Sequence, residues 1–300
     1  MPSNISVLIP AYGPSPYIQF TLQSILDNSL RPDEILVIDD GLTEEAKSLI
    51  NSFAKSLPVK ILPNRAKGLV EALNTGISLA KGTYIARIDN DDCMARNRLE
   101  RQLMQMESDL RIVAVGSQCI YINSEGVKTG RSNYPTGELN NSPGFKYKCL
   151  IAHPSTLFRR STALLVGGYR SVFTWDGADI AEDFDFWLRL SQEGIIFVSD
   201  ELLTEYRQHS AQLSYTHLAG QLVGAPYISA VNLSGIKNPQ KIKFVGAASK
   251  ETRIVLTAIR LNLGIKKYLV CRLRLYLLRG MGLASNQVFR AAISKFISVQ

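Results

Sequence analysis

An acidic cluster, Asp89-Asn90-Asp91-Asp92, is the part of the sequence best suited to chemistry. It directly follows residues 83–88, an apolar run rich in the residue types that favour β-strands. Carboxylates at the end of a buried strand would lie at the rim of a sheet, where α/β proteins bind ligands. Such crowded carboxylates repel one another unless a cation is near, and Mg²⁺ or Mn²⁺ takes oxygen ligands of this kind. The cluster therefore indicates a divalent-metal site, with a solvated acidic loop as the alternative.

A second acidic pair, Glu182-Asp183, opens a segment whose apolar residues recur at helical spacing. Acids in the first turn of a helix are stabilised by the helix dipole, so a purely structural role is one interpretation. A catalytic role is the other, because a carboxylate within hydrogen-bond reach of a hydroxyl can take its proton as the oxygen attacks. Asp183 is therefore a candidate general base.

The elements that would position these acids follow from the alternation of apolar runs and helical patterns in the first 90 residues. The sequence predicts strands at residues 5–9, 34–38, 59–62 and 84–88, and helices at residues 16–28, 43–55 and 67–80. This order predicts an α/β fold with a mostly parallel sheet and helices on both faces. Ligands of such sheets gather at the carboxyl ends of the strands. These ends carry Pro10-Ala11-Tyr12, Asp39-Asp40, Asn64-Arg65 and the acidic cluster.

The middle of the chain is less regular. Residues 96–107 have helical spacing, and residues 112–122 predict one or two strands. Residues 124–144 are rich in Gly, Asn, Ser and Pro, which predicts a loop.

Several classes of protein do not fit the sequence. The four cysteines contain no CxxC pair, so neither a disulfide framework nor a zinc–thiolate site is expected. No stretch of 18 apolar residues predicts a membrane-spanning helix, and the amino terminus has no secretory-signal pattern. The P-loop and nucleophile-elbow motifs are missing, and three histidines make a histidine-rich zinc site improbable.

Charge is distributed unevenly along the chain. Residues 1–240 contain 22 Lys and Arg against 25 Asp and Glu, whereas residues 241–300 contain 12 Lys and Arg and a single acid, Glu251. A nearly neutral body with a basic tail suggests contact with an anionic surface, either phospholipid or nucleic acid. A solvated or packed carboxyl-terminal helix is the alternative.

Eight short motifs occur in an order that resembles glycosyltransferases of family 2 with the GT-A fold. The motifs are Ser6–Tyr12, Ile35–Gly41, Gly68–Gly76, Ala86–Asp92, His153–Thr156, Gly167–Arg170, Ala181–Leu188 and Tyr206–His209. The resemblance covers roughly residues 4–215 and is strongest to bacterial enzymes that build O-antigen or exopolysaccharide repeat units. It implies a domain over residues 1–220, with a nucleotide-sugar half at 1–122 and an acceptor and catalytic half at 123–220. Residues 221–300 would form a basic helical extension.

The resemblance implies a donor site for a UDP-sugar. Pro10, Ala11 and Tyr12 would line the nucleobase pocket, although Tyr12 can also be read as a packing aromatic. Asp40, together with Asp39, would read the uracil edge. The other residues implied near the nucleotide are Lys67, Gly68 and, on the ribose side, Asp89.

The resemblance also implies metal-dependent, inverting chemistry. Asp91 would bind Mn²⁺ or Mg²⁺ with support from Asp92, and His209 would approach the metal or the diphosphate. Asp183 would be the catalytic base. Four residues are implied on the acceptor side: His153, Arg159, Glu182 and Trp187, the last with a helix-core position as its alternative. The family's Asp-Asp-Gly-Ser turn ends in Leu42 here, and Thr43 is expected to replace the lost helix cap.

The implied function is transfer of one hexose or N-acetylhexosamine from a UDP-sugar to a saccharide carried on a polyprenyl diphosphate. The enzyme would lie in the cytoplasm, peripheral on the inner face of the cell membrane, with residues 241–300 on the anionic surface and no role for nucleic acid. A sugar nucleotidyltransferase and a non-catalytic sugar-nucleotide binder remain as alternatives.

Overall fold

The computed structural model describes residues 3–142, 144–175, 177–210, 212, 218–233 and 241–244. The chain forms two compact units. The first comprises Met1–Phe145, Cys149–Arg170 and Phe186–Gln212, and the second Lys146–Lys148, Ser171–Asp185 and Leu213–Gln300. The boundary expected at residue 220 stays a prediction, because the second unit takes in residues on both sides of it. Residues 245–300 lie outside the described residues, and so do the basic face and membrane contact predicted for them.

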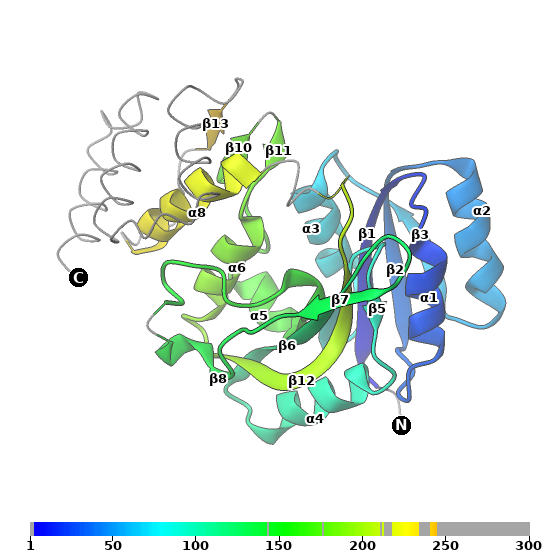
Figure 1. Ribbon diagram of the computed structural model, residues 1–300, viewed down its shortest axis with the longest axis horizontal. Coiled ribbons are helices and arrows are strands. Elements are labelled where there is room, and N and C mark those ends of the chain that lie inside the picture. The colour runs from blue at the N-terminus through cyan, green and yellow to red at the C-terminus, as the bar shows by residue number, and fades with distance from the viewer. Residues whose placement is uncertain are drawn as a thin grey trace. The chain divides into compact units, whose positions relative to one another are not determined.

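The first unit begins with the predicted alternation of strands and helices (Figure 1). Its elements are β1 (Ile5–Gly13), α1 (Ile18–Leu26), β2 (Glu34–Leu42), α2 (Glu44–Ser52), η1 (Phe53–Lys55), β3 (Val59–Pro63), α3 (Leu69–Leu79) and β4 (Tyr84–Arg87). The strands pair in parallel in the order β3-β2-β1-β4. Thr43 caps α2 by accepting the N–H of Ala46, as expected. The predicted α/β class is confirmed.

Beyond β4 the sheet becomes mixed. The added elements are β5 (Cys93–Met94), α4 (Arg98–Ser108), β6 (Ile112–Ile122), η3 (His153–Ser155), β9 (Leu157–Arg159), α5 (Arg160–Leu165) and β12 (Ile195–Arg207). β9 runs antiparallel between β4 and β6, whereas β12 pairs with β6 in parallel. Residues 124–144 are not entirely loop. They contain β7 (Lys128–Arg131), β8 (Gly137–Glu138) and η2 (Leu139–Asn141).

Helices cover both faces of the parallel strands. One face of β1 places Ile5, Val7 and Ile9 in an apolar core that also holds buried side chains of α1, α2 and α4. The opposite face carries Leu8, which contacts α3 at Gly76 so closely that a Cβ on that glycine would overlap the leucine side chain. This layering fixes the strands and their carboxyl ends.

The second unit contains a small three-stranded sheet and a helix. Its strands are β10 (Phe173–Trp175), β11 (Ala178–Asp179) and β13 (Ile242–Phe244), in the order β11-β10-β13. α8 (Leu218–Leu233) approaches β10 at Gly224, where a Cβ would stand 3.1 Å from the ring of Phe173. α6 (Glu182–Leu190) begins in this unit and ends in the first. Among the described residues, no helix combines the length and apolarity needed to cross a membrane.

Candidate active site

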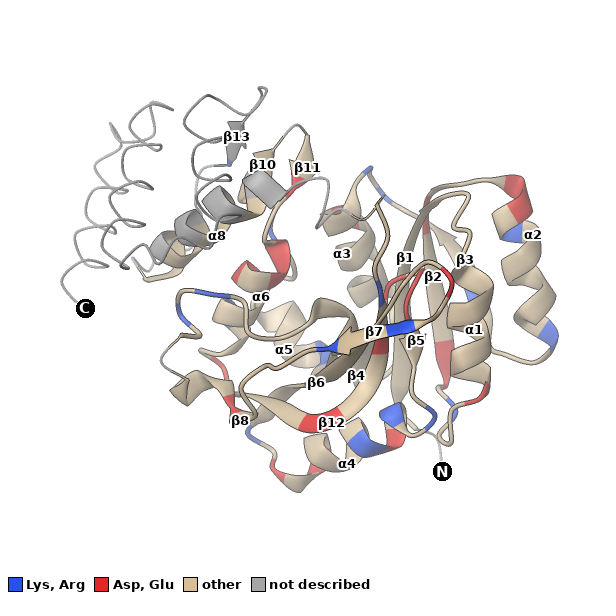
Figure 2. Ribbon diagram, viewed as in Figure 1, with Lys and Arg blue, Asp and Glu red and all other residues tan. Residues whose placement is uncertain are grey.

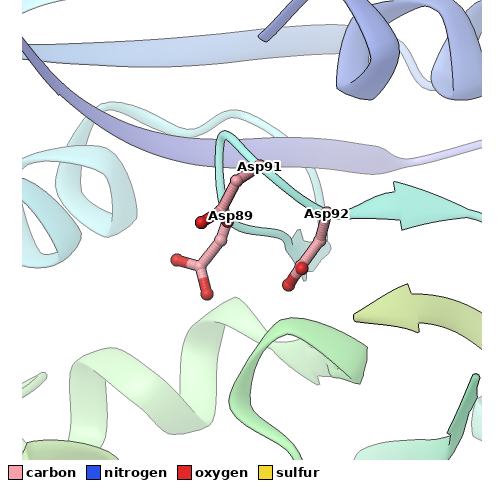
Figure 3. Close-up of side chains that lie close together, drawn as sticks. All are labelled: Asp89, Asp91 and Asp92. Atoms are coloured by element: carbon pink, nitrogen blue, oxygen red, sulfur yellow. The ribbon is translucent and has the colours of Figure 1, made fainter. Parts of the chain in front are cut away.

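Three carboxylates gather on the loop between β4 and β5. Asp89, Asp91 and Asp92 each place one oxygen within 4.8 Å of the other two (Figure 3). They lie at the carboxyl end of β4, the edge of a parallel sheet at which ligands bind. The structure thus brings the three acids together where the sequence predicted them.

Asp89 is held by a buried arginine. Arg87, the last residue of β4, has 2% of its surface exposed and donates two hydrogen bonds to the Asp89 carboxylate, at 2.7 and 2.5 Å. Burial opposes the charge of Arg87, but Asp89, Tyr169 and Asp92 together outweigh it and raise the pKa of the guanidinium. Asp89 is therefore fixed and paired with a cation.

Asp92 is fully buried and only partly satisfied. Its Oδ1 accepts the N–H of Arg207 at 2.8 Å, whereas Oδ2 has no hydrogen-bond partner in the described part of the chain. Burial, followed by the charges of Asp91 and Asp89, raises the pKa of Asp92 well above its usual value. A carboxylate in this position is stabilised by a bound cation or by a proton.

Asp91 meets a histidine from far along the chain. His209, two residues beyond β12, places Nε2 2.9 Å from Oδ2 of Asp91, and its ring lies 5.4 Å from that of Tyr17. Three carboxylates with an imidazole beside them provide the oxygen and nitrogen donors that suit Mn²⁺ or Mg²⁺. The residues present therefore fit a divalent ion, and the part of His209 in binding it stays a prediction.

The end of β1 forms a second part of this edge. Pro10 and Ala11 are buried, whereas Tyr12 is 73% exposed. The Tyr12 ring lies beside the β2 turn, because a Cβ on Gly41 would stand 3.4 Å from it. Gly41 has a φ of +119°, a conformation that residues with a side chain rarely adopt, so the shape of this turn favours glycine. An exposed ring in this place provides a stacking surface.

Asp39 stabilises the turn that follows it at the end of β2. Its Oδ1 accepts the N–H groups of Gly41 and Leu42 at 2.9 and 2.7 Å, and Lys47 lies 3.2 Å from Oδ2. Burial raises the pKa of Asp39, but the two main-chain donors and Lys47 together lower it. Asp39 thus shapes the β2 turn, and its predicted contact with a base stays a prediction.

Asp40 is tied to the start of α3. Its carboxylate accepts the N–H of Gly68 at 3.0 Å and the side-chain amide of Asn64 at 2.8 Å. The Asn64 side chain in turn accepts the hydroxyl of Thr75 at 3.2 Å, so it is anchored to α3. Lys67 is exposed beside them. The structure brings Asp40, Lys67 and Gly68 together, and their contact with a nucleotide stays a prediction. It adds Asn64 to the group, a residue that the sequence marked only by its position at the end of β3.

Arg159 does not lie at this edge, so the prediction that it borders the acceptor is wrong. β9 runs antiparallel to β4, and Arg159 pairs with Tyr84 at the amino end of that strand. Its guanidinium donates to the main-chain oxygens of Ile112 and Met106 at 2.8 and 3.0 Å. Arg159 therefore joins β6 and α4 at the edge opposite the acids.

His153 and Trp187 are interior residues. Nε2 of His153 lies 2.8 Å from the hydroxyl of Tyr169, and burial, followed by the charge of Arg87, lowers its pKa well below the usual value. Trp187 is completely buried, with its ring against His153 and Phe158. The acceptor-side prediction for Trp187 is wrong, since this side chain is a core residue. The prediction for His153 stays open.

Glu182 and Asp183 form the acidic first turn of α6, red in Figure 2. Glu182 is 8% exposed, and Asp183 is half-buried, with Oδ1 accepting the N–H of Phe184 at 2.7 Å. Both residues belong to the second unit. Their roles as acceptor contact and general base stay predictions.

The α/β unit, with its parallel strands extended by antiparallel ones, has the architecture of the GT-A fold. S. aureus TarS 1–349 in complex with UDP-GlcNAc has the same fold, with a TM-score of 0.59 and 15% identity over 100% of this chain and 93% of that one. The mannosyltransferase PcManGT from Pyrobaculum calidifontis, in complex with GDP-Man and Mn²⁺, has a TM-score of 0.57 and 15% identity over 99% and 80%. The expected GT-A fold is confirmed.

Residues 6–165 match the model of glycosyl transferase family 2, and the chain belongs to this family. The O-antigen biosynthesis glycosyltransferase WbnJ of Escherichia coli is 31% identical over 72% of this chain and 84% of its own. The Escherichia coli UDP-Glc:alpha-D-GlcNAc-diphosphoundecaprenol beta-1,3-glucosyltransferase WfaP is 29% identical over 70% and 79%. The family resemblance predicted from the motifs is confirmed.

Proposed function

We propose that this protein is an inverting glycosyltransferase of bacterial surface-polysaccharide assembly. It transfers one hexose or N-acetylhexosamine from a UDP-sugar to a saccharide carried on a polyprenyl diphosphate. The observation that carries the proposal is the grouping of Asp89, Asp91 and Asp92 at one end of the parallel strands. The names of WbnJ and WfaP support the pathway, and that of WfaP supports the donor and the lipid-linked acceptor.

A divalent ion fits the acidic cluster because Asp92 Oδ2 is buried and has no hydrogen-bond partner among the residues that the structure describes. Asp91 and Asp92 would hold it, with His209 beside Asp91. When bound, the ion would neutralise the negative charge that grows on the departing diphosphate. The Mn²⁺ in the mannosyltransferase complex supports a metal in this fold.

The remaining chemistry belongs to the protein side chains. Asp183 would take the proton of the acceptor hydroxyl as it attacks the anomeric carbon on the face opposite the leaving group. A single displacement inverts that carbon, which converts an α-linked donor to a β-linked product. The beta linkage in the name of WfaP agrees with this outcome.

Base recognition would depend on Asp40, held by Asn64 and Gly68. A carboxylate accepts the N3–H of uracil, whereas N3 of cytosine has no hydrogen to donate. Replacing Asn64 with Ala removes a charge-assisted hydrogen bond from Asp40 and leaves the carboxylate less well oriented. We expect Asn64→Ala to weaken UDP binding by about tenfold, the equivalent of about 1.4 kcal/mol, and to reduce the preference for UDP over CDP.

Calorimetric titration with UDP and CDP measures both effects. Asn74→Ala is the matched control, because Asn74 also lies on the α3 side of the sheet and bonds the main chain of Tyr169 without touching Asp40. If Asn64→Ala kept the UDP affinity and the UDP preference of the wild type, Asn64 would not orient the base-reading group.

Turnover tests the proposal as a whole. The purified protein is offered a panel of UDP-sugars with a polyprenyl-diphosphate-linked GlcNAc acceptor and Mn²⁺, and release of UDP and the product linkage are measured. We expect one UDP-sugar to give a single added β-linked residue. Release of pyrophosphate from a nucleoside triphosphate instead would support a sugar nucleotidyltransferase.

The location at the cytoplasmic face of the membrane, with residues 241–300 on anionic lipid, is part of the proposal and is tested by vesicle flotation.

A further inference from the structure

We infer that Arg207 is a positioning residue of the metal site. It sets the relative position of Asp91 and Asp92 and thereby the affinity of the site for a divalent cation. The inference rests on the proposed function, because it concerns the same acidic cluster.

Arg207 holds both acids from the end of β12. Its main-chain N–H donates to Oδ1 of Asp92 at 2.8 Å, and its Nε donates to the carbonyl oxygen of Asp91 at 2.9 Å. One residue therefore fixes the side chain of Asp92 and the main chain of Asp91. Asp91, which accepts the Nε bond, lies 116 positions before Arg207 in the sequence.

The Arg207 side chain is itself held on its other sides. Nη1 donates to the carbonyl oxygens of Asn123 and Ser124 at 3.1 and 3.3 Å. The guanidinium carbon lies 4.5 Å from the ring centre of Tyr17 and 5.6 Å from that of Phe20. A cation over aromatic faces is further stabilised. The residue is 3% exposed, and its guanidinium joins the acidic loop to the Asn123–Ser124 turn and to the aromatic rings at the start of α1.

Arg207 and Arg87 act on the cluster in different ways. Arg87 donates to both oxygens of Asp89 and so pairs with that carboxylate. The Nε of Arg207 donates to the carbonyl oxygen of Asp91 and not to a carboxylate. Oδ2 of Asp92 has no hydrogen-bond partner among the described residues. Arg207 therefore orders two acids without occupying the oxygens that an ion needs. Partners that orient metal ligands in this way raise metal affinity by about 10- to 100-fold.

Lysine cannot replace this arrangement. A guanidinium presents several N–H groups in a fixed plane, whereas a single ammonium has no such spread. An ammonium at position 207 reaches either the Asp91 carbonyl or the Asn123 turn. The bond to Asp92 comes from the main-chain N–H, so the Met and Lys variants keep this part of the site.

The experiment measures Mn²⁺ binding to the full chain without nucleotide, from the electron paramagnetic resonance signal of free Mn²⁺. We expect Arg207→Met to weaken binding by at least about tenfold and Arg207→Lys by an intermediate amount. Arg160→Met is the matched control, because Arg160 also bonds two carbonyls, of Ile77 and Ser78, but touches none of the acids. It should bind Mn²⁺ within about twofold of the wild type.

Rescue separates positioning from a general loss of structure. Because the acids remain in Arg207→Met, excess Mn²⁺ should restore most of its sugar transfer, which it would not do for an unfolded variant. Wild-type Mn²⁺ affinity in a folded Arg207→Met overturns the inference. If that variant does not fold, wild-type affinity in Arg207→Lys overturns it. Failure of the wild type itself to bind Mn²⁺ overturns the metal proposal and this inference together.

Discussion

Asp91→Asn is expected to lower kcat/KM for sugar transfer by about a thousandfold while the protein stays folded. The carboxylate of Asp91 contacts His209, and Asp91 shares its loop with Asp92, whose Oδ2 has no hydrogen-bond partner in the described structure. In the proposed mechanism, losing one charge from the cluster would weaken the hold on the ion. It would thereby weaken the stabilisation of the diphosphate in the transition state, a kind of effect that costs about 10²–10³ in rate.

Steady-state turnover with the competent UDP-sugar and Mn²⁺ measures this effect. Asp109→Asn is the control, because Asp109 pairs only with Arg111 in the described structure and lies in an exposed turn before β6. It should keep wild-type turnover. Wild-type kcat/KM in Asp91→Asn would remove the acidic cluster from the mechanism.

Asp183→Asn is expected to lower kcat by about 10²- to 10⁴-fold and to leave the affinity for the UDP-sugar unchanged. Asparagine keeps the size and the first-turn position of the side chain on α6 but cannot take a proton from the acceptor. The split between kcat and donor affinity identifies a base, since a residue that bound the donor would alter both.

Single-turnover kinetics and a donor titration of the same variant measure the two quantities. The control is Asp185→Asn on the same turn of α6, where Asp185 bonds the side chain of Asn232 at 3.0 Å within the second unit. Its kcat should change by less than about tenfold. A kcat close to the wild-type value in Asp183→Asn would assign the proton transfer to another group.

The parallel part of the sheet could be predicted from sequence because its signal is local. β1 to β4 are short apolar runs, and the helices between them have clear periodicity and, for α2, a capping threonine. β12 gives no such signal, because its pairing with β6 shifts register between Val198 and Leu202 and breaks the alternation of apolar residues. β9 has only three residues, too few to show any period.

The acids of the site could be predicted for the same reason, since they follow directly on a strand whose end marks the ligand edge. Arg159 was placed on the acceptor side by the resemblance alone, and the antiparallel direction of β9, which the sequence does not reveal, puts it at the opposite edge of the sheet. The supporting residues Arg87 and Arg207 carry no local signal for their roles, and Asn64 has only its place at the end of β3. Arg207 reaches Asp91 across 116 positions, a contact that only the packed fold creates.

Calorimetric titration of UDP into the protein, with Mn²⁺ and with EDTA, tests the central claim most directly. If the acidic cluster holds an ion against the diphosphate, Mn²⁺ should tighten UDP binding at least about tenfold in the wild type and not in Asp91→Asn. Equal UDP affinity with and without Mn²⁺, or no UDP binding at all, would contradict the account.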